Sequence, residues 1–151
     1  MRKWNLGLAL VLALAGCRGM GLKDEAAGDL ERNSVDSDRN VGETRTLAGL
    51  AALETALASY VKGEQRIPER LEELVPKYLA EVPDVDVEIA GHQETSAVKY
   101  YDSDLIRNGQ IDGTKLKDTG KWGYAHNDRQ VVIFVDCTHS SSRGKPWYQE
   151  R

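Results

Sequence analysis

The stretch "TRTLAGLAALETALASYVKG", residues 44–63, decides the fold of this chain. Large apolar side chains recur in it every three or four residues, as they do along one face of a helix. This stripe contains Leu47, Leu50, Leu53, Leu57, Tyr60 and Val61. Thr44 or Thr46 can cap the start of the helix, and Gly63 suits the left-handed conformation after its end. The stretch therefore predicts an amphipathic helix with one face in the core.

A short second helix is predicted directly downstream, in "IPERLEELVPKYLAEVP" (residues 67–83). Pro68 fits the first turn of such a helix and Pro76 ends it. Its inward-facing residues are Leu71, Leu74 and Val75, and the connection that follows is expected to pack on the first helix through Tyr78, Leu79 and Val82.

After Pro83 the pattern changes from helical to alternating. Four candidate strands follow: "VDVEIA" (85–90), "AVKYY" (97–101), "KWGYAH" (121–126) and "QVVIFVDC" (130–137). The last two flank residues 127–129, which form a typical hairpin turn. The order of elements predicts an α+β domain over residues 44–151, with a long helix and a short helix packed on a small antiparallel sheet.

Residues 17–43 differ from this domain in composition. They are rich in Gly, Asp, Glu, Arg, Asn and Ser, and they show no apolar period. Such a segment has little to bury, so a flexible tether is predicted. The alternative is an upstream extension of the first helix.

Residues 1–16 have the layout of a secretory signal peptide, with Arg2 and Lys3 before an apolar middle. The apolar run is too short for a membrane span, which needs about 20 residues. The following "LAGC", residues 14–17, resembles the lipobox of bacterial lipoproteins. That resemblance implies cleavage before Cys17 and acylation of this residue, which would hold the protein to membrane lipid. In the sorting pattern of enteric Gram-negative lipoproteins, which this segment resembles, Arg18 after the cysteine implies the outer membrane of the cell envelope. The alternative is an ordinary signal peptide with a cysteine by chance.

The segment "LETALASYVKGEQRIPERLEELVPKYLAEVP", residues 53–83, resembles the opening of the head domain in type II secretion pseudopilins and type IV pilin-like proteins. The matching residues are Leu57, Tyr60, Gly63, Pro68, Leu71, Leu74, Pro76, Tyr78, Leu79 and Pro83. Residues 118–124 and 133–139 also resemble pilin-like heads. The resemblance implies a helical spine across a small sheet, and a role as a non-catalytic subunit of a secretion or pilus filament. The apolar polymerising helix of these families is absent from the sequence, so we infer a pilin-like head on a lipid anchor.

The sequence "DCTH" contains Cys137 and His139, which would share one face of a strand. This pair suggests a nucleophile or a metal ligand, but the neighbouring sequence offers no second pair of ligands. A buried structural thiol is therefore the preferred interpretation of Cys137, and a thiol enzyme is the alternative. His92 and His126 are isolated in the sequence and receive no role.

The segment before the last strands is acidic and contains Asp102, Asp104, Asp112 and Asp118. Oxygen ligands in a flexible loop suit calcium, and the resemblance to major pseudopilins implies a calcium site in this region. Asp112 and Asp118 are the candidate ligands. The spacing is not that of an EF-hand, and solvated aspartates in turns are the simpler explanation. The late aromatic residues Trp122, Tyr124, Trp147 and Tyr148 are expected in the core rather than in a sugar-binding platform.

The charge pattern and the motifs narrow the function. The formal net charge is −4, and the basic residues are scattered among acidic ones, which disfavours nucleic acid as a partner. The sequence has no phosphate loop, nucleophile elbow or paired acid–base carboxylates, so no enzyme is predicted. We expect a non-catalytic lipoprotein that contacts proteins of an envelope or secretion apparatus. The alternative is a surface module that binds a glycan or a calcium-bridged ligand.

Overall fold

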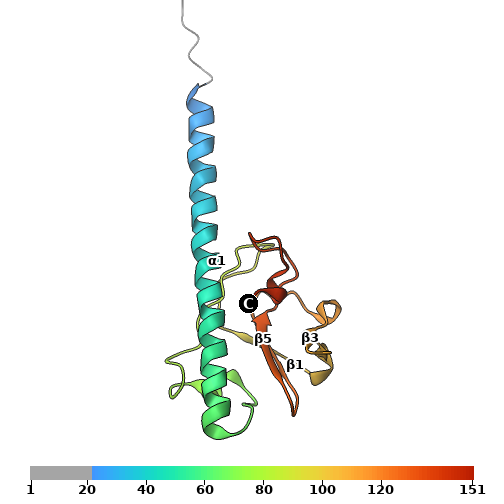
Figure 1. Cartoon of the computed structure of the whole chain (residues 1–151). Helices are drawn as coiled ribbons and strands as arrows, with labels where there is room; N and C mark the ends of the chain where they lie inside the picture. Colours follow the sequence, from blue (N-terminus) through green and yellow to red (C-terminus); the bar gives the residue numbers. More distant parts are fainter. Residues whose placement is uncertain (1–21) are drawn as a thin grey trace, which may run out of the picture. The chain divides into compact units, whose positions relative to one another are not determined.

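The computed structural model describes the backbone of residues 22–151 and the side chains of residue 32 and of residues 34–151. The predicted signal peptide, the lipidation site Cys17 and the tether up to residue 21 lie outside the described residues. The described chain is α+β, as predicted, with one long helix and two small sheets (Figure 1). Residues 34–151 form one compact unit. In the described part of the chain, no helix combines the length and the apolar character that a membrane crossing requires.

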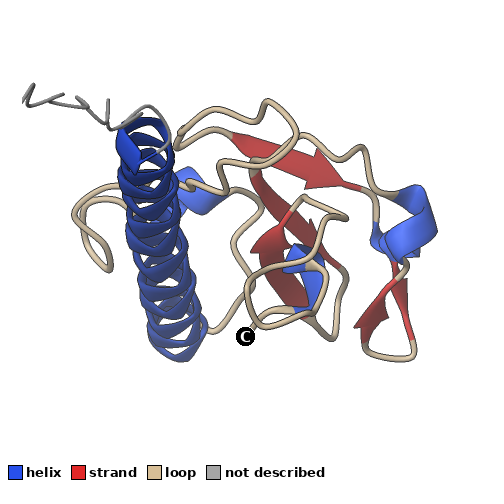
Figure 2. Cartoon of the chain, turned by 90° about the horizontal axis from the view of Figure 1, so that it is seen from above, coloured by secondary structure: helices blue, strands red, loops and turns tan. Residues whose placement is uncertain are grey.

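The helix α1 runs from Leu22 to Glu64. Its predicted apolar stripe is confirmed, because Leu50, Leu53, Leu57 and Tyr60 are all buried. They pack in one cluster with residues of the turn after the helix and of the strands, namely Leu71, Leu74, Val85, Val87, Trp122, Tyr124, Ile133, Val135, Cys137 and Trp147. Figure 2 shows the main sheet on one side of this helix.

The start of α1 corrects the prediction of a flexible tether. The helix already includes residues 22–43, so the alternative of a helical extension describes this part of the chain. Thr44 and Thr46 lie inside the helix and do not cap it; the Thr46 hydroxyl donates to the Asp86 carbonyl at 2.9 Å. The side chains of residues 34–41 are all exposed. Once the packed segment has formed a helix, each added residue extends it at low cost, even without a buried apolar side chain. The extension therefore has no apolar periodicity by which the sequence could reveal it.

The end of α1 also differs from the prediction. Gly63 is still helical, and the left-handed residue after the helix is Gln65, with φ of 55°. A Cβ atom on Gly63 would lie 2.5 Å from the Tyr78 hydroxyl oxygen. The glycine therefore provides space for Tyr78 rather than a positive φ.

The predicted second helix is reduced to the 3-10 turn η1, Leu71–Leu74. Leu71 and Leu74 are buried, as the pattern indicated. Two prolines, Pro68 and Pro76, bound this segment, and a residue before proline avoids the α conformation. The space between them therefore holds a single turn.

The main sheet has the strand order β1 (Val98–Tyr101), β4 (Trp122–His126) and β5 (Val131–Val135). The predicted hairpin is confirmed, because β4 and β5 pair antiparallel. The prediction of a wholly antiparallel sheet is wrong, since β1 pairs with β4 in parallel. The connection between β1 and β4 is long enough for a crossover. It contains the small hairpin of β2 (Ile106–Arg107) and β3 (Gln110–Ile111), the 3-10 turn η2 (Ser103–Leu105) and the 3-10 turn η3 (Gly113–Lys115).

The first predicted strand, residues 85–90, is not formed. Only an isolated bridge joins Val85 to Thr95. The backbone N–H of Asp86 donates to the Thr46 hydroxyl at 2.7 Å instead of to another strand. Positive φ angles at Glu88 and Ala90 then end the extended conformation.

The aromatic residues of the late strands belong to the core, as predicted. Trp122, Tyr124 and Trp147 are buried, and Tyr148 is partly buried. Trp147 and Tyr148 belong to the 3-10 turn η4 (Trp147–Gln149). On the other face of the sheet, Phe134 forms a second cluster with Leu105 and Ala125.

Candidate functional site

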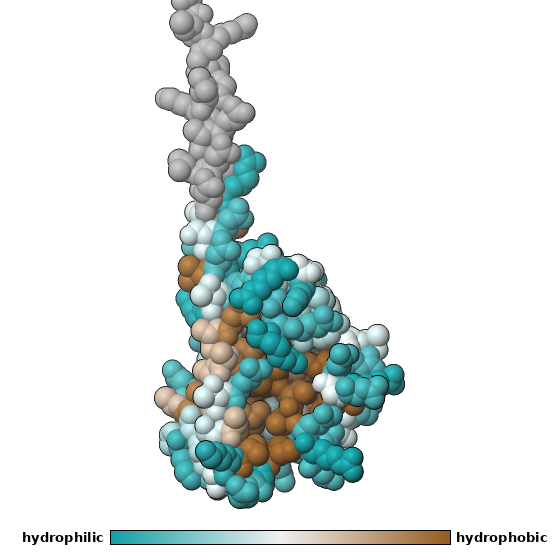
Figure 3. Space-filling view, in the orientation of Figure 1, coloured by the Kyte–Doolittle hydropathy of each residue, from teal (hydrophilic) through white to brown (hydrophobic). Residues whose placement is uncertain are grey.

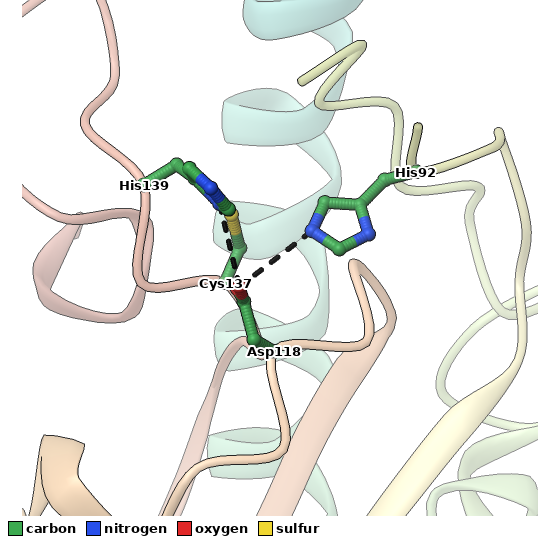
Figure 4. Close-up of side chains that lie close together, drawn as sticks. All are labelled: His92, Asp118, Cys137 and His139. Carbon is green, nitrogen blue, oxygen red and sulfur yellow. Dashed lines mark hydrogen bonds and ion pairs between the residues drawn. The ribbon is translucent and has the colours of Figure 1, made fainter. Parts of the chain in front are cut away.

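Four side chains meet beyond the end of β5: His92, Asp118, Cys137 and His139 (Figure 4). Their ligand atoms all lie within 4.8 Å of one another, and we call this group the His92 cluster. Among the described residues, it is the one place where three or more His, Cys, Asp or Glu side chains come this close. Cys137 and His139 follow β5, Asp118 precedes β4, and His92 comes from the turn that follows residues 85–90.

The distances within the His92 cluster are short and similar. The sulfur of Cys137 lies 3.5 Å from Nδ1 of His139. The same Nδ1 lies 3.4 Å from Oδ2 of Asp118, and Nε2 of His92 lies 3.7 Å from Oδ1 of Asp118. The two imidazole rings meet edge to face, with centroids 5.9 Å apart. The four groups therefore converge on one small volume instead of forming a linear chain.

Backbone hydrogen bonds hold each of the contributing segments. The N–H of His92 donates to the Ile89 carbonyl at 3.0 Å, which closes the turn. The N–H of Thr138 donates to Oδ1 of Asp118 at 2.8 Å. The carbonyl of His139 accepts from the Trp147 N–H at 3.0 Å. The orientation of the cluster is thus set by the fold.

Gly120 provides the space for the imidazole of His92. Its φ is +68°, and a Cβ atom at this position would collide with Cγ of His92. The N–H of Gly120 donates to the Asp136 carbonyl at 2.9 Å, which fixes the backbone at this close approach. Any larger residue here would displace the ring.

Burial decides the protonation of the cysteine. Cys137 is 0% exposed, and this burial raises the pKa of its thiol to about 12. Burial also acts to raise the pKa of Asp118, but the Thr138 N–H and the two imidazoles outweigh it and lower that pKa. Nε2 of His92 is buried and has no hydrogen-bond partner. The free protein therefore holds a neutral thiol, a carboxylate and an unsatisfied imidazole nitrogen.

The geometry does not support a catalytic thiol. In a thiol–imidazole–carboxylate arrangement, the carboxylate holds the imidazole nitrogen that does not face the thiol. Here Nδ1 of His139 faces both Cys137 and Asp118. A reactive cysteine also needs exposure and a lowered pKa, and Cys137 has neither. The prediction of a buried thiol is confirmed.

The two calcium candidates lie among different partners. The carboxylate of Asp112 accepts from the Thr114 hydroxyl at 2.6 Å and lies 3.3 Å from Nε of Arg107. Asp118 belongs to the His92 cluster instead. The structure therefore gives no geometric support to a calcium site shared by Asp112 and Asp118.

The sequence analysis identified Cys137, His139 and Asp118 but missed His92. The "CTH" spacing was the available signal, because it places two ligand types close together. Nothing in the spacing of His92 or Asp118 shows that they join this pair, since only the fold brings the segments together. Comparisons with known proteins add no assignment: no protein-family model, no curated protein and no solved structure matches the chain.

A second feature is an apolar groove between α1 and β5, with a volume of about 540 Å³. Its apolar lining residues are Leu57, Ala58, Val61, Val131, Val132 and Ile133, and its charged lining residues are Glu54, Lys62 and Arg151. Figure 3 shows apolar surface between the helix and the strands on this face. We call this feature the β5 groove.

The β5 groove runs along an edge of the main sheet, because β5 is the last strand in the order. The backbone N–H of Asn127 donates to the Gln130 carbonyl, and the backbone N–H of Asp136 donates to the Lys121 carbonyl. Hydrogen-bonded pairs alternate along an antiparallel ladder, so the even-numbered residues of β5 direct their backbone groups to β4. The N–H and C=O groups of Val131 and Ile133 therefore point away from β4. No hydrogen bond from the described residues reaches them.

Proposed function

We propose that this protein is a lipid-anchored component of the bacterial envelope whose pilin-like head binds other proteins and has no catalytic role. The apparatus that it serves is a type II secretion or type IV pilus system. The lipobox at residues 14–17 supports the anchor, and the motif of residues 53–83 supports the pilin likeness. The order of one long helix followed by a small sheet agrees with such a head.

The β5 groove is the observation that carries the interaction role. The proposed occupant is an extended segment of a partner protein that adds a strand to β5. Val131 and Ile133 offer two residues of unpaired edge backbone, to which an added strand can hydrogen-bond. Leu57, Ala58 and Val61 form an apolar wall beside this edge, which suits the apolar side chains of such a strand.

Site-specific photo-crosslinking in living cells tests the groove. Ala58 and Ser59 are neighbours on α1 and both are exposed, but only Ala58 lines the groove. A benzophenone residue at Ala58 should form a crosslink to a subunit of the secretion or pilus apparatus, identified by mass spectrometry, and the same group at Ser59 should not. Equal crosslinking from both positions, or none from Ala58, would contradict the proposal.

Labelling with an alkyne fatty acid tests the anchor separately. The chain has two cysteines, so Cys17→Ser and Cys137→Ser form a matched pair. We expect Cys17→Ser to abolish the label and to release the protein from the membrane fraction. The Cys137→Ser protein should be labelled like the wild type. Equal labelling of the Cys17→Ser and wild-type proteins, or no label on either, would contradict the anchor.

A further inference from the structure

We propose that the His92 cluster binds one Zn²⁺ ion, with His92, Asp118, Cys137 and His139 as its four ligands. The proposal is independent of the partner and of the lipid anchor, because it rests on the geometry of these side chains alone. One sulfur, two imidazole nitrogens and one carboxylate oxygen form a donor set that zinc accepts in proteins. The ligand atoms already lie within 4.8 Å of one another.

The spacing matches a tetrahedral site. With the usual bond lengths of zinc to sulfur, nitrogen and oxygen, neighbouring ligand atoms lie about 3.3–3.7 Å apart. The sulfur of Cys137 and Oδ2 of Asp118 lie 3.5 and 3.4 Å from Nδ1 of His139, within this range. Nε2 of His92 lies 3.7 Å from the other oxygen of Asp118, Oδ1. Mutual hydrogen bonds explain the arrangement less well, because 3.4 and 3.7 Å are long for an imidazole and a carboxylate.

The buried nitrogen of His92 gives a second argument. A buried polar atom without a partner costs free energy, and native structures rarely contain one without a reason. Nε2 of His92 is such an atom, and it lies on the side of the ring that faces Asp118. A zinc ion at the centre of the cluster would satisfy this nitrogen and give the convergent side chains a common partner.

The donor chemistry selects zinc over the hard cations. Calcium takes six to eight oxygen ligands, and magnesium binds through oxygens as well. The His92 cluster offers one carboxylate among nitrogen and sulfur donors. All four tetrahedral positions are filled by protein, which is typical of structural zinc rather than of catalytic zinc with an open position.

Binding requires one proton to leave. The burial of Cys137 keeps its thiol protonated in the free protein. When zinc binds, the S–H bond breaks, a Zn–S bond forms and the proton passes to solvent, because a coordinating thiol is deprotonated. One oxygen of Asp118 then serves the ion while the other keeps its hydrogen bond from the Thr138 N–H.

The ion would join segments that the sheet does not join. His92 lies in a turn outside the named strands, whereas Asp118 precedes β4 and Cys137 follows β5. A shared zinc ion therefore cross-links this turn to both strands of the hairpin. Gly120 fits this role, because its missing side chain lets the His92 ring approach the other ligands.

Titration of the full chain in detergent with Co²⁺, after treatment with a chelator, tests the proposal. We expect saturation at one equivalent, with the intense visible bands of tetrahedral Co²⁺ and a thiolate-to-cobalt charge-transfer band. One equivalent of Zn²⁺ should remove these bands. The pale spectrum of six-coordinate Co²⁺, or the absence of saturable binding, would overturn the proposal.

Matched variants locate the site. Cys137→Ser should abolish the charge-transfer band and Cys17→Ser should keep it. His92→Gln should weaken Co²⁺ binding at least about tenfold, while His126→Gln, outside the cluster, should leave it unchanged. Circular dichroism identifies any variant that fails to fold. If Cys137→Ser does not fold, the comparison of His92→Gln with His126→Gln decides the test. Equal effects within either pair would contradict the assignment.

Discussion

Two polar clusters of this domain differ in how well the protein satisfies them. The Glu73 network is complete. One carboxylate oxygen of Glu73 accepts from the backbone N–H groups of Glu69 and Arg70 at 2.8 and 3.2 Å. The other accepts from the Tyr60 hydroxyl and the Arg66 guanidinium, both at 2.6 Å. Every oxygen lone pair of this carboxylate has a donor.

The His92 cluster is incomplete by the same measure. Nε2 of His92 has no hydrogen-bond partner, and one nitrogen of His139 faces both a sulfur and a carboxylate oxygen. A satisfied network stabilises a fold by itself, whereas convergent metal-ligating side chains that include a buried nitrogen without a partner indicate a missing partner. The comparison therefore teaches that the first cluster is structural as it stands and that the second needs an ion.

The largest effect is expected at the complete cluster. Glu73→Ala should lower the free energy of unfolding by about 3 kcal/mol, because it leaves the Glu69 and Arg70 N–H groups, Tyr60 and Arg66 without their acceptor. Urea unfolding measures this loss. The exposed Glu69→Ala variant keeps the backbone N–H and should change stability by less than about 0.5 kcal/mol. Similar losses in the two variants would show that the network contributes little.

The next effect belongs to the incomplete cluster. At free zinc a hundredfold above its dissociation constant, the unfolding free energy should rise by about 2.7 kcal/mol relative to chelated protein. The same rise is expected in Glu73→Ala, since the two clusters share no residue and distant sites act independently. His92→Gln should lose most of it. Zinc-dependent stabilisation of equal size in His92→Gln would place the ion elsewhere.

A smaller effect is the dependence of stability on pH. The hydrogen bond from Tyr60, opposed by burial and aided by Arg66 and the backbone N–H groups, lowers the pKa of Glu73 to about 2. A lowered pKa in the folded state contributes stability above the unfolded pKa, and this contribution is lost as the pH falls towards the folded pKa. Because the Glu73 side chain is 30% exposed, water screens its charge and the contribution is smaller than the full shift implies. It should be on the order of 2 kcal/mol and should disappear between roughly pH 5 and pH 2.

Acid unfolding measures this contribution of Glu73. The comparison is made in the His92→Gln background, because release of zinc at low pH then does not add to the loss of stability. Between pH 5 and pH 2, the unfolding free energy of the Glu73→Gln protein should fall by about 2 kcal/mol less than that of the protein with Glu73. Parallel curves with and without Glu73 would show that the carboxylate is not specially stabilised.

The smallest expected change in stability distinguishes alanine substitutions at two glycines. Gly109 and Gly120 both have positive φ, of +78° and +68°, so alanine strains the backbone at either site. At Gly109 a Cβ atom meets only Gln130 Oε1 at 3.9 Å, whereas at Gly120 it would collide with His92. We expect Gly120→Ala to cost about 1 kcal/mol more than Gly109→Ala and to be the only one of the two that weakens Co²⁺ binding. Equal Co²⁺ affinities would show that the ring of His92 does not depend on Gly120.

The parts of the fold that follow from local pattern could be predicted from the sequence. The apolar stripe of α1 and the turn at Asn127 between β4 and β5 are signals carried by neighbouring residues. The parallel pairing of β1 with β4 is not local, because it depends on the path of the chain between the two strands. The loss of the strand at residues 85–90 is also a tertiary effect, since Thr46 takes the backbone bonds of Asp86.

The candidate site shows the same division. Cys137 and His139 are close in sequence, so their proximity could be expected from a strand. His92 and Asp118 reach them only through the turn at Ile89 and the close approach at Gly120. No spacing rule contains this information, so the sequence could not show that Asp118 and His92 join Cys137 and His139.

The central claim is that a metal ion completes the His92 cluster, and zinc K-edge X-ray absorption of the full chain with one equivalent of zinc tests it most directly. The account predicts a shell of one sulfur at about 2.3 Å and three nitrogen or oxygen atoms at about 2.0–2.1 Å. The sulfur should be absent in Cys137→Ser and present in Cys17→Ser. A shell of nitrogen and oxygen alone in the wild-type protein, or six ligands, would contradict it.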